Sequence, residues 1–404
     1  MVSTYDFIII GAGILGLTTA NELRKRYPES RIAILEKEER VGMHASGRNS
    51  GVLHSGIYYG SETLKAKVCS KGASKMRQFA EKHRISCQRS GKIILAASDK
   101  DLPAIDRLIA NALQNNIRAE RLDAIGIKNL EPYANQAFGG IYSPDTAVID
   151  GPAVLKKLTE LLLIRGIDII YNQKIQRIKT TEKRVYSSDR DYDFGFLFNC
   201  AGAGADIIAK KMNLGAGYAL LPFKGIYYKI RSEKSYLVKS SIYPVPDLNL
   251  PFLGVHLTRV ISGDVYVGPT AIPAFGRENY GLLKGIKLFE GGIIGWQLVT
   301  LYLKNKNHFR LLVNTELRKY IKRYFLETTR RLVPDLRDDD LIPSNKVGIR
   351  PQLVNTRTKS LEMDYIIEQD SISMHVLNAI SPAFTSSFAF AELLVDRYES
   401  AVKN

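Results

Sequence analysis

Residues 7–16 read Phe-Ile-Ile-Ile-Gly-Ala-Gly-Ile-Leu-Gly, and this stretch decides the fold of the chain. An apolar run typical of a strand leads into a Gly-x-Gly-x-x-Gly turn, and helical patterning continues to about Tyr27. A second strand is expected over 31–35 and ends directly before Glu36, 20 residues after Gly16. This order of strand, glycine turn, helix, strand and acid predicts a dinucleotide-binding unit.

Each part of this unit has a physical task. Gly11 allows the tight turn, Gly13 allows a pyrophosphate to approach the backbone, and Gly16 allows the helix to pack closely on the strand. The helix N-terminus offers free N–H groups and the positive end of its dipole to phosphate oxygens. Glu36 is placed to accept hydrogen bonds from a ribose diol.

The composition is typical of a globular protein with more than one domain. The chain has 404 residues, of which 45% are hydrophobic and 24% charged. Its three cysteines are scattered and show no metal-binding spacing, so we expect a reduced intracellular protein without a metal site. The N-terminus enters the first strand directly, which argues against a signal peptide and predicts a cytoplasmic location.

The net charge of +16 is concentrated in one region. Residues 284–331 contain 11 basic and 3 acidic residues, a surplus of 8, which is half of the total. The apolar run at 293–303 is too short to span a membrane. A second apolar stripe follows at helical spacing, with basic residues on the other faces: Leu317, Tyr320, Ile321, Tyr324, Phe325 and Leu332. Such a stripe faces either the core or an anionic membrane surface on the cytoplasmic side; nucleic acid is the least favoured partner.

Features of a nucleotide-binding domain recur along the chain. The apolar run at 194–200 ends in the small-residue segment 201–205, and another apolar run at 374–380 precedes a final helix expected over 386–402. Residues 220–268 alternate in the manner of a mostly antiparallel sheet. We therefore expect an α/β protein with a discontinuous Rossmann-like FAD-binding domain and an α+β substrate-binding domain. The expected ranges are 1–85, 145–215 and 335–404 for the first, and 86–144 and 216–334 for the second.

Three features favour FAD over NAD as the dinucleotide. The fingerprint lies at the extreme N-terminus, and small-residue segments at 201–205 and 378–387 are expected to return to the first loop. The loop at 48–56 is rich in small residues and suits a flat ring system close to the backbone. FAD is therefore the expected cofactor.

Several longer segments are specific enough to compare with a known family. Residues 49–59 read Asn-Ser-Gly-Val-Leu-His-Ser-Gly-Ile-Tyr-Tyr, and 348–352 read Gly-Ile-Arg-Pro-Gln. Together with segments 64–66, 242–247, 251–259, 267–269 and 378–383, they resemble the L-2-hydroxyglutarate oxidase/dehydrogenase family of D-amino-acid-oxidase-like flavoproteins. The resemblance implies oxidation of (S)-2-hydroxyglutarate to 2-oxoglutarate by hydride transfer to flavin N5, with the electrons passed to a quinone or oxygen.

The resemblance also implies roles for particular residues. His256 and His54 are the candidates for the base that takes the hydroxyl proton. Arg350 is the candidate for binding the substrate carboxylate, and Tyr243 either donates to the substrate or packs in the core. The candidates for a second cation, which would hold the distal carboxylate, are Arg259, which is preferred, and Lys65, Lys224 and Arg277.

The expected cofactor-binding residues come from the fingerprint, from the following loop and from the small-residue segments. They are Gly11, Gly13, Ile14, Leu15, Gly16, Glu36, Lys37, Ser46, Asn49, Ser50, Gly51, Val52, Ile175, Ala201, Gly202, Ser381, Pro382, Ala383 and Thr385.

Two other kinds of flavoprotein are alternatives. An FAD-dependent amine oxidase of the glycine/sarcosine type shares the expected fold and an anchoring arginine, but it needs no cation for a distal carboxylate. An RNA-modifying flavoprotein needs a basic track with interleaved aromatic residues, whereas the aromatic residues here lie on the apolar stripe. A small dicarboxylate remains the preferred substrate. Peripheral contact with an anionic membrane and its quinones is a possible further interaction, although an ordinary core-facing helix is favoured for the basic region.

Overall fold

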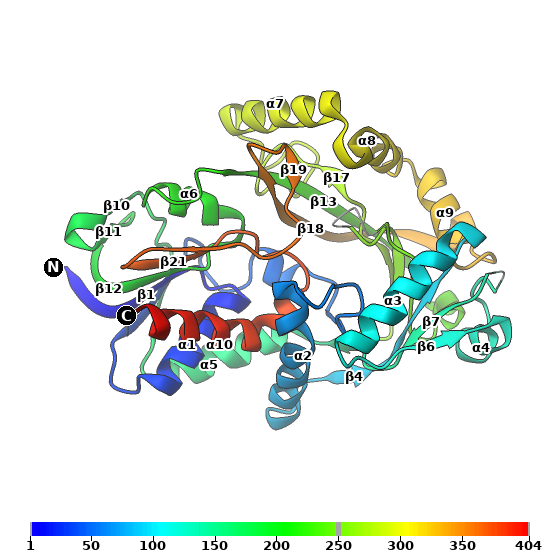
Figure 1. Ribbon diagram of the computed structural model, residues 1–404, viewed down its shortest axis with the longest axis horizontal. Coiled ribbons are helices and arrows are strands. Elements are labelled where there is room, and N and C mark those ends of the chain that lie inside the picture. Colours follow the sequence, from blue (N-terminus) through cyan, green and yellow to red (C-terminus); the bar gives the residue numbers. More distant parts are fainter. Residues whose placement is uncertain (1, 137, 248–251, 403–404) are drawn as a thin grey trace.

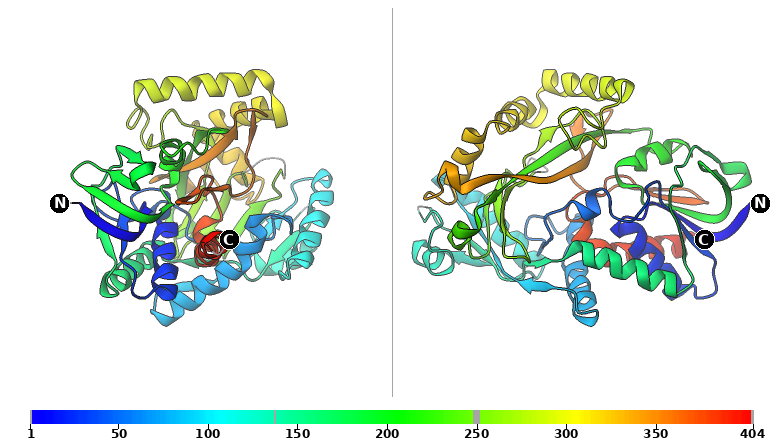
Figure 2. Two further views of the ribbon diagram at one scale, coloured as in Figure 1. Left: turned by 60° about the vertical axis from the view of Figure 1, so that its left-hand side comes forward. Right: turned by 180° about the vertical axis from the view of Figure 1, so that it is seen from behind.

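The computed structural model describes residues 2–136, 138–247 and 252–402, so Pro251 of the family-like segment 251–259 lies outside the described residues. The chain forms two large sheets with helices packed on them (Figure 1). Both ends of the chain lie in the part that contains the smaller of these two sheets (Figures 1 and 2).

The N-terminal strand is central to an eight-stranded sheet, ordered β10-β11-β12-β1-β2-β9, with β21 beside β12 and β20 beside β21. Four strand pairs are parallel: β1 with β12, β1 with β2, β2 with β9, and β12 with β21. The bounds are β1 Ser3–Ile10, β2 Ile32–Leu35, β9 Asp168–Ile170, β10 Arg177–Lys179, β11 Arg184–Tyr186, β12 Asp191–Asn199, β20 Ile367–Gln369 and β21 Ser373–Val376.

Four helices assemble around one face of this sheet (Figure 1). Helix α10 packs on both α1 and α2, and α5 packs on α1. A Cβ atom at Gly72 of α2 would lie 2.5 Å from the Cα of Ser386 in α10, so the absence of a side chain permits this close packing. The short helix α6 covers the other face. The bounds are α1 Ile14–Arg26, α2 Leu64–Lys82, α5 Gly151–Ile164, α6 Ala205–Lys210 and α10 Ala383–Val402.

The second sheet has ten strands in the order β19-β18-β13-β16-β15-β14-β5-β7-β6, with β17 beside β13. Its pairs are antiparallel, except for β14 and β5. The bounds are β5 Lys92–Leu95, β6 Glu120–Leu122, β7 Gly140–Ser143, β13 Tyr218–Ile230, β14 Ser241–Pro244, β15 His256–Arg259, β16 Val265–Gly268, β17 Ile272–Pro273, β18 Leu341–Asn355 and β19 Ser360–Leu361.

A three-stranded sheet joins β3 Val52–Leu53, β8 Ala147–Ile149 and β4 Cys87–Arg89. Helices α3 Leu102–Gln114 and α4 Ala124–Leu130 lie beside β7 and β6. The expected fold class is confirmed: a mostly parallel nucleotide-binding sheet accompanies a mostly antiparallel one. The domain ranges stay a prediction, but β18 and β19 pair within the antiparallel sheet although 335–404 were expected in the FAD-binding domain.

The basic region forms three successive helices that pack against the ten-stranded sheet on the outside of the molecule (Figure 1). They are α7 Leu288–Lys304, α8 Phe309–Arg318 and α9 Lys322–Arg330. The apolar stripe is not one helix face: it extends over the end of α8, the turn after it, α9 and the turn that follows. Phe325 and Leu332 are buried, whereas Leu317 and Ile321 are exposed. Among the described residues, no helix combines the length and the apolar character needed to cross a bilayer.

Candidate active site

The glycine turn has the geometry that the fingerprint predicts. Gly11 has a φ of +101°, and a Cβ there would lie 2.7 Å from the carbonyl oxygen of Cys200 in the loop after β12. A Cβ at Gly16 would lie 1.9 Å from the carbonyl oxygen of Gly11. Because neither position tolerates a side chain, the backbone between β1 and α1 remains open to a phosphate group.

The acid at the end of β2 is held in a fixed orientation. Glu36 is buried, and its carboxylate accepts hydrogen bonds from the N–H groups of Ala12 at 2.7 Å and Glu38 at 3.0 Å. Nearby, the hydroxyl of Ser46 accepts a hydrogen bond from the N–H of Ile14 at 2.9 Å. The carboxylate of Glu36, the hydroxyl of Ser46 and the backbone N–H of Ile14, all expected near the cofactor, are therefore held in fixed positions around the turn.

A cavity of about 890 Å³ runs from the glycine turn to the region between the two large sheets. Its volume suits a large ligand. Gly16 and Gly51 do not line it and instead shape the backbone. The other expected cofactor-binding residues all line it: Gly11, Gly13, Ile14, Leu15, Glu36, Lys37, Ser46, Asn49, Ser50, Val52, Ile175, Ala201, Gly202, Ser381, Pro382, Ala383 and Thr385.

The two candidate histidines line the same cavity. The Nδ1 atom of His256 lies 2.9 Å from the carbonyl oxygen of Gly254 and donates to it, which leaves the Nε2 lone pair as the only acceptor of this ring. Burial lowers the pKa of His256 to about 4 and that of His54 to about 3. Both imidazoles are therefore neutral at physiological pH and able to accept a proton.

The ring of Tyr243 stacks on the ring of His256, with 3.8 Å between the centroids and 15° between the planes. Both residues lie on adjacent strands of the ten-stranded sheet, β14 and β15. The stack fixes the plane of the imidazole.

Arg350 of β18 presents a charge to the cavity with no acid beside it. Its Nε is buried without a hydrogen-bond partner, and no ion pair is found for it among the described residues. The guanidinium carbon lies 5.1 Å from the ring centre of Phe252. Burial lowers the pKa of Arg350 to about 10, so the group remains charged near neutral pH. A half-buried guanidinium without an acidic partner is a receptor for an anion.

The other candidate cations are engaged elsewhere. Lys65 donates to the carbonyl of Met363, Lys224 to that of Gly281, and Arg259 to those of Ser235 and Val238. These three do not line the cavity, whereas Arg277 lines it but pairs with Asp206 and Glu290. The structure thus brings together four of the expected substrate-site residues: His54, His256, Arg350 and Tyr243.

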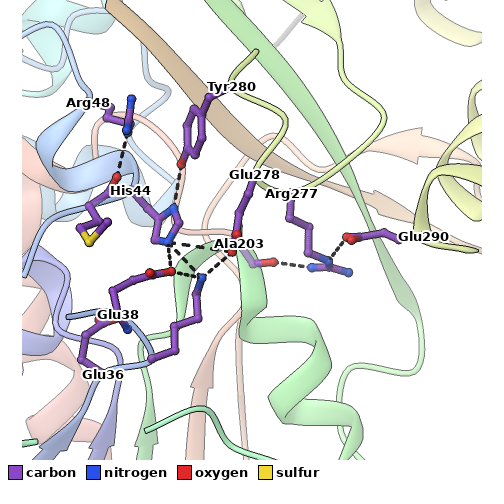
Figure 3. A network of polar contacts seen from close by, with 11 residues as sticks. Glu36, Glu38, His44, Arg48, Ala203, Arg277, Glu278, Tyr280 and Glu290 are labelled. Atoms are coloured by element: carbon purple, nitrogen blue, oxygen red, sulfur yellow. Dashed lines mark hydrogen bonds and ion pairs between the residues drawn. The ribbon is translucent and has the colours of Figure 1, made fainter. Parts of the chain in front are cut away.

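A polar network joins the loop after β2 to the loop before α7 (Figure 3). Lys37 donates to Glu38 and Glu278, and the Nδ1 atom of His44 lies 2.8 Å from the hydroxyl of Tyr280. The guanidinium of Arg48 lies over the ring of Tyr280 at 4.2 Å. Sequence reasoning missed Glu278 and Tyr280 because about 240 residues separate them from their partners.

Comparison with known proteins identifies the class. Residues 6–397 match the family model described as FAD dependent oxidoreductase, and the chain belongs to that family. FAD is its cofactor, in agreement with the cavity described above. The chain is 36% identical to a protein of Indibacter alkaliphilus named L-2-hydroxyglutarate dehydrogenase, over 95% of this chain and 96% of the relative. It is 33% identical to a protein of the same name from Escherichia coli K12, over 98% and 93%.

A solved structure confirms the fold. The L-α-glycerophosphate oxidase of Mycoplasma pneumoniae, with FAD bound, superimposes with a TM-score of 0.78 at 20% identity, over 98% of this chain and 95% of the other. The fold expected from the sequence is thus confirmed, and the family match given above confirms the expected cofactor.

Proposed function

We propose that this protein oxidises the C2 hydroxyl group of (S)-2-hydroxyglutarate and releases 2-oxoglutarate. One observation carries the proposal: the unpaired guanidinium of Arg350 and the neutral imidazole of His256 line one cavity. A 2-hydroxy acid presents a carboxylate and a hydroxyl on adjacent carbons, which matches a cavity lined by both an anion receptor and a proton acceptor. The names of the relatives given above support this substrate.

Each side chain has one task in the reaction. Bound FAD supplies the two-electron acceptor. Arg350 binds the C1 carboxylate and thereby positions the C2 carbon. The Nε2 atom of His256 accepts the hydroxyl proton while Gly254 holds its Nδ1 proton in place. His54, whose Nδ1 atom is buried without a hydrogen-bond partner, is the second candidate for the group that accepts this proton.

The test is an anaerobic titration of the purified holoprotein. We expect (S)-2-hydroxyglutarate to bleach the absorbance of the oxidised flavin and to yield one 2-oxoglutarate per flavin. The R enantiomer, glycine and sarcosine should leave the spectrum unchanged. Bleaching by glycine or sarcosine alone would instead identify an amine oxidase.

We also propose that α7 contacts an anionic membrane surface. Leu288, Phe289 and Trp296 are 94%, 85% and 73% exposed, although apolar side chains of this size are usually buried. Lys284 and Lys287 are exposed beside them and complement an anionic headgroup layer. Contact with a membrane would place the protein near quinones, which are one of the two expected electron acceptors.

Vesicle binding tests this contact. The holoprotein should co-sediment with vesicles of phosphatidylglycerol and phosphatidylcholine at low salt, and less with phosphatidylcholine alone. Replacing Leu288, Phe289 and Trp296 together with serine should weaken binding at least about tenfold, because three apolar side chains no longer enter the interface. The matched control replaces Leu163 and Ile164, exposed on α5, with serine. Equal binding by both variants would contradict the proposal.

A further inference from the structure

A lysine lies buried beside the active site without a partner for its charge. Lys92 opens β5 and is fully buried, and its Nζ atom has no hydrogen-bond partner. No carboxylate pairs with it among the described residues. Buried charges are ordinarily paired, because leaving one unpaired costs several kcal/mol of folding free energy (an order-of-magnitude value for real proteins). An exception in this position calls for a functional explanation.

Two aromatic rings take the place of a counter-ion. The Nζ atom lies 4.3 Å from the ring centre of Tyr58 and 5.0 Å from that of Tyr243. Tyr243 stacks in turn on His256. Lys92, Tyr243 and His256 therefore form a continuous series of contacts that crosses β5, β14 and β15 and ends at the candidate base.

The charge of Lys92 acts on both histidines of the cavity. After burial itself, the repulsion from Lys92 is the next contribution that lowers the pKa of His54, and it also lowers the pKa of His256. Burial lowers the pKa of Lys92 to about 7. The ammonium is therefore charged below about pH 7, which is the range in which an ordinary imidazole becomes protonated.

The other titratable groups that face Lys92 do not compete for this role. Cys69 of α2 and the two tyrosines are buried, and burial raises the pKa of each group. They remain neutral over the physiological range. His54 and His256 are thus the neighbours on which the charge of Lys92 acts, in addition to their burial.

We propose that Lys92 is a positioning residue of the active site, which fixes the Tyr243–His256 ring stack and whose positive charge adds to the burial that disfavours the protonated form of both imidazoles. The inference rests on the proposed function for its kinetic consequence. Lys92 touches neither substrate nor cofactor, because it does not line the cavity. It acts through Tyr243 and through its charge.

The kinetic test compares pH profiles of flavin reduction by (S)-2-hydroxyglutarate. In the Lys92→Met holoprotein, the acid limb of kcat/KM should move to higher pH by about one unit, because the repulsion that disfavours imidazolium is gone. Lys92→Arg keeps the charge and should restore the limb. Lys346→Met is the matched control, since Lys346 is a lysine of the same sheet that lies over two other rings, those of Tyr227 and Tyr266. Its limb should coincide with that of the unaltered protein.

The proposal would be overturned if, at equal flavin content, the acid limb of kcat/KM fell at the same pH in Lys92→Met and in the unaltered protein. Equal shifts in Lys92→Met and Lys346→Met would overturn it as well. A second measurement needs no substrate: an NMR titration of the imidazoles in the unaltered holoprotein and in flavin-loaded Lys92→Met. The imidazoles of His54 and His256 should become protonated at a higher pH in Lys92→Met than in the unaltered protein. Identical titration in the two proteins would refute the role of Lys92 even if the proposed substrate were wrong.

Discussion

Replacing Arg350 with methionine will lower kcat/KM for (S)-2-hydroxyglutarate by on the order of 100-fold or more. A carboxylate bound to a buried guanidinium loses about 2–5 kcal/mol of binding free energy when that partner is truncated. Most of the loss should be a rise in KM, because the guanidinium binds the C1 carboxylate before and during the reaction. Steady-state kinetics and binding of an unreactive dicarboxylate check this expectation.

The control for Arg350 is an arginine at the end of the same strand. Arg357 is exposed just beyond β18, so Arg357→Met should leave kcat/KM unchanged. Arg350→Met must also retain its flavin, which excludes a general loss of structure. Unaltered affinity for the dicarboxylate in a flavin-loaded Arg350→Met protein would show that the carboxylate binds elsewhere.

Replacing His256 with asparagine will slow flavin reduction by about 10²- to 10⁴-fold, the usual contribution of a general base. The effect should be on the rate of reduction at saturating substrate, with little change in KM. Because burial lowers the pKa of His256 to about 4, the neutral base is present above that pH and is lost as the pH falls through it. The unaltered protein should therefore show no acid limb between about pH 5 and 7.

The same experiment on His54 decides between the two imidazoles. His54→Asn should reduce the rate less than His256→Asn, because only His256 has its Nδ1 proton fixed by a carbonyl group. Stopped-flow reduction measured over a range of pH distinguishes the two variants. A larger loss in His54→Asn would transfer the role of base to that residue.

Local sequence patterns were sufficient for the nucleotide-binding part. The glycine turn, the strand before it and Glu36 lie within about 30 residues, so their mutual geometry follows from local spacing. The first turn of α10 was placed too late, since the helix begins at Ala383 rather than near Ser386.

The substrate site depends on contacts between distant segments, and sequence patterns predicted it less completely. Arg259 was favoured because it follows His256 closely on one strand, yet its guanidinium turns to the carbonyls of Ser235 and Val238. The role of Lys92 was not expected, although a lysine that begins an otherwise apolar strand was a visible signal. Burial and ring contacts that involve Tyr58 and Tyr243 could not be inferred from spacing along the chain.

The network of Lys37, Glu278, His44 and Tyr280 has a consequence for how the holoprotein is assembled. This network joins the segment before α7 to the loop after β2, beside the part of the cavity that Glu36 and Lys37 line. The ion pair of Arg277 with Asp206 is a second connection of the same segment. The dinucleotide must then be taken up before these connections form, or after they have opened. On either route, uptake and release of the cofactor are coupled to ion pairs that are remote from the chemistry.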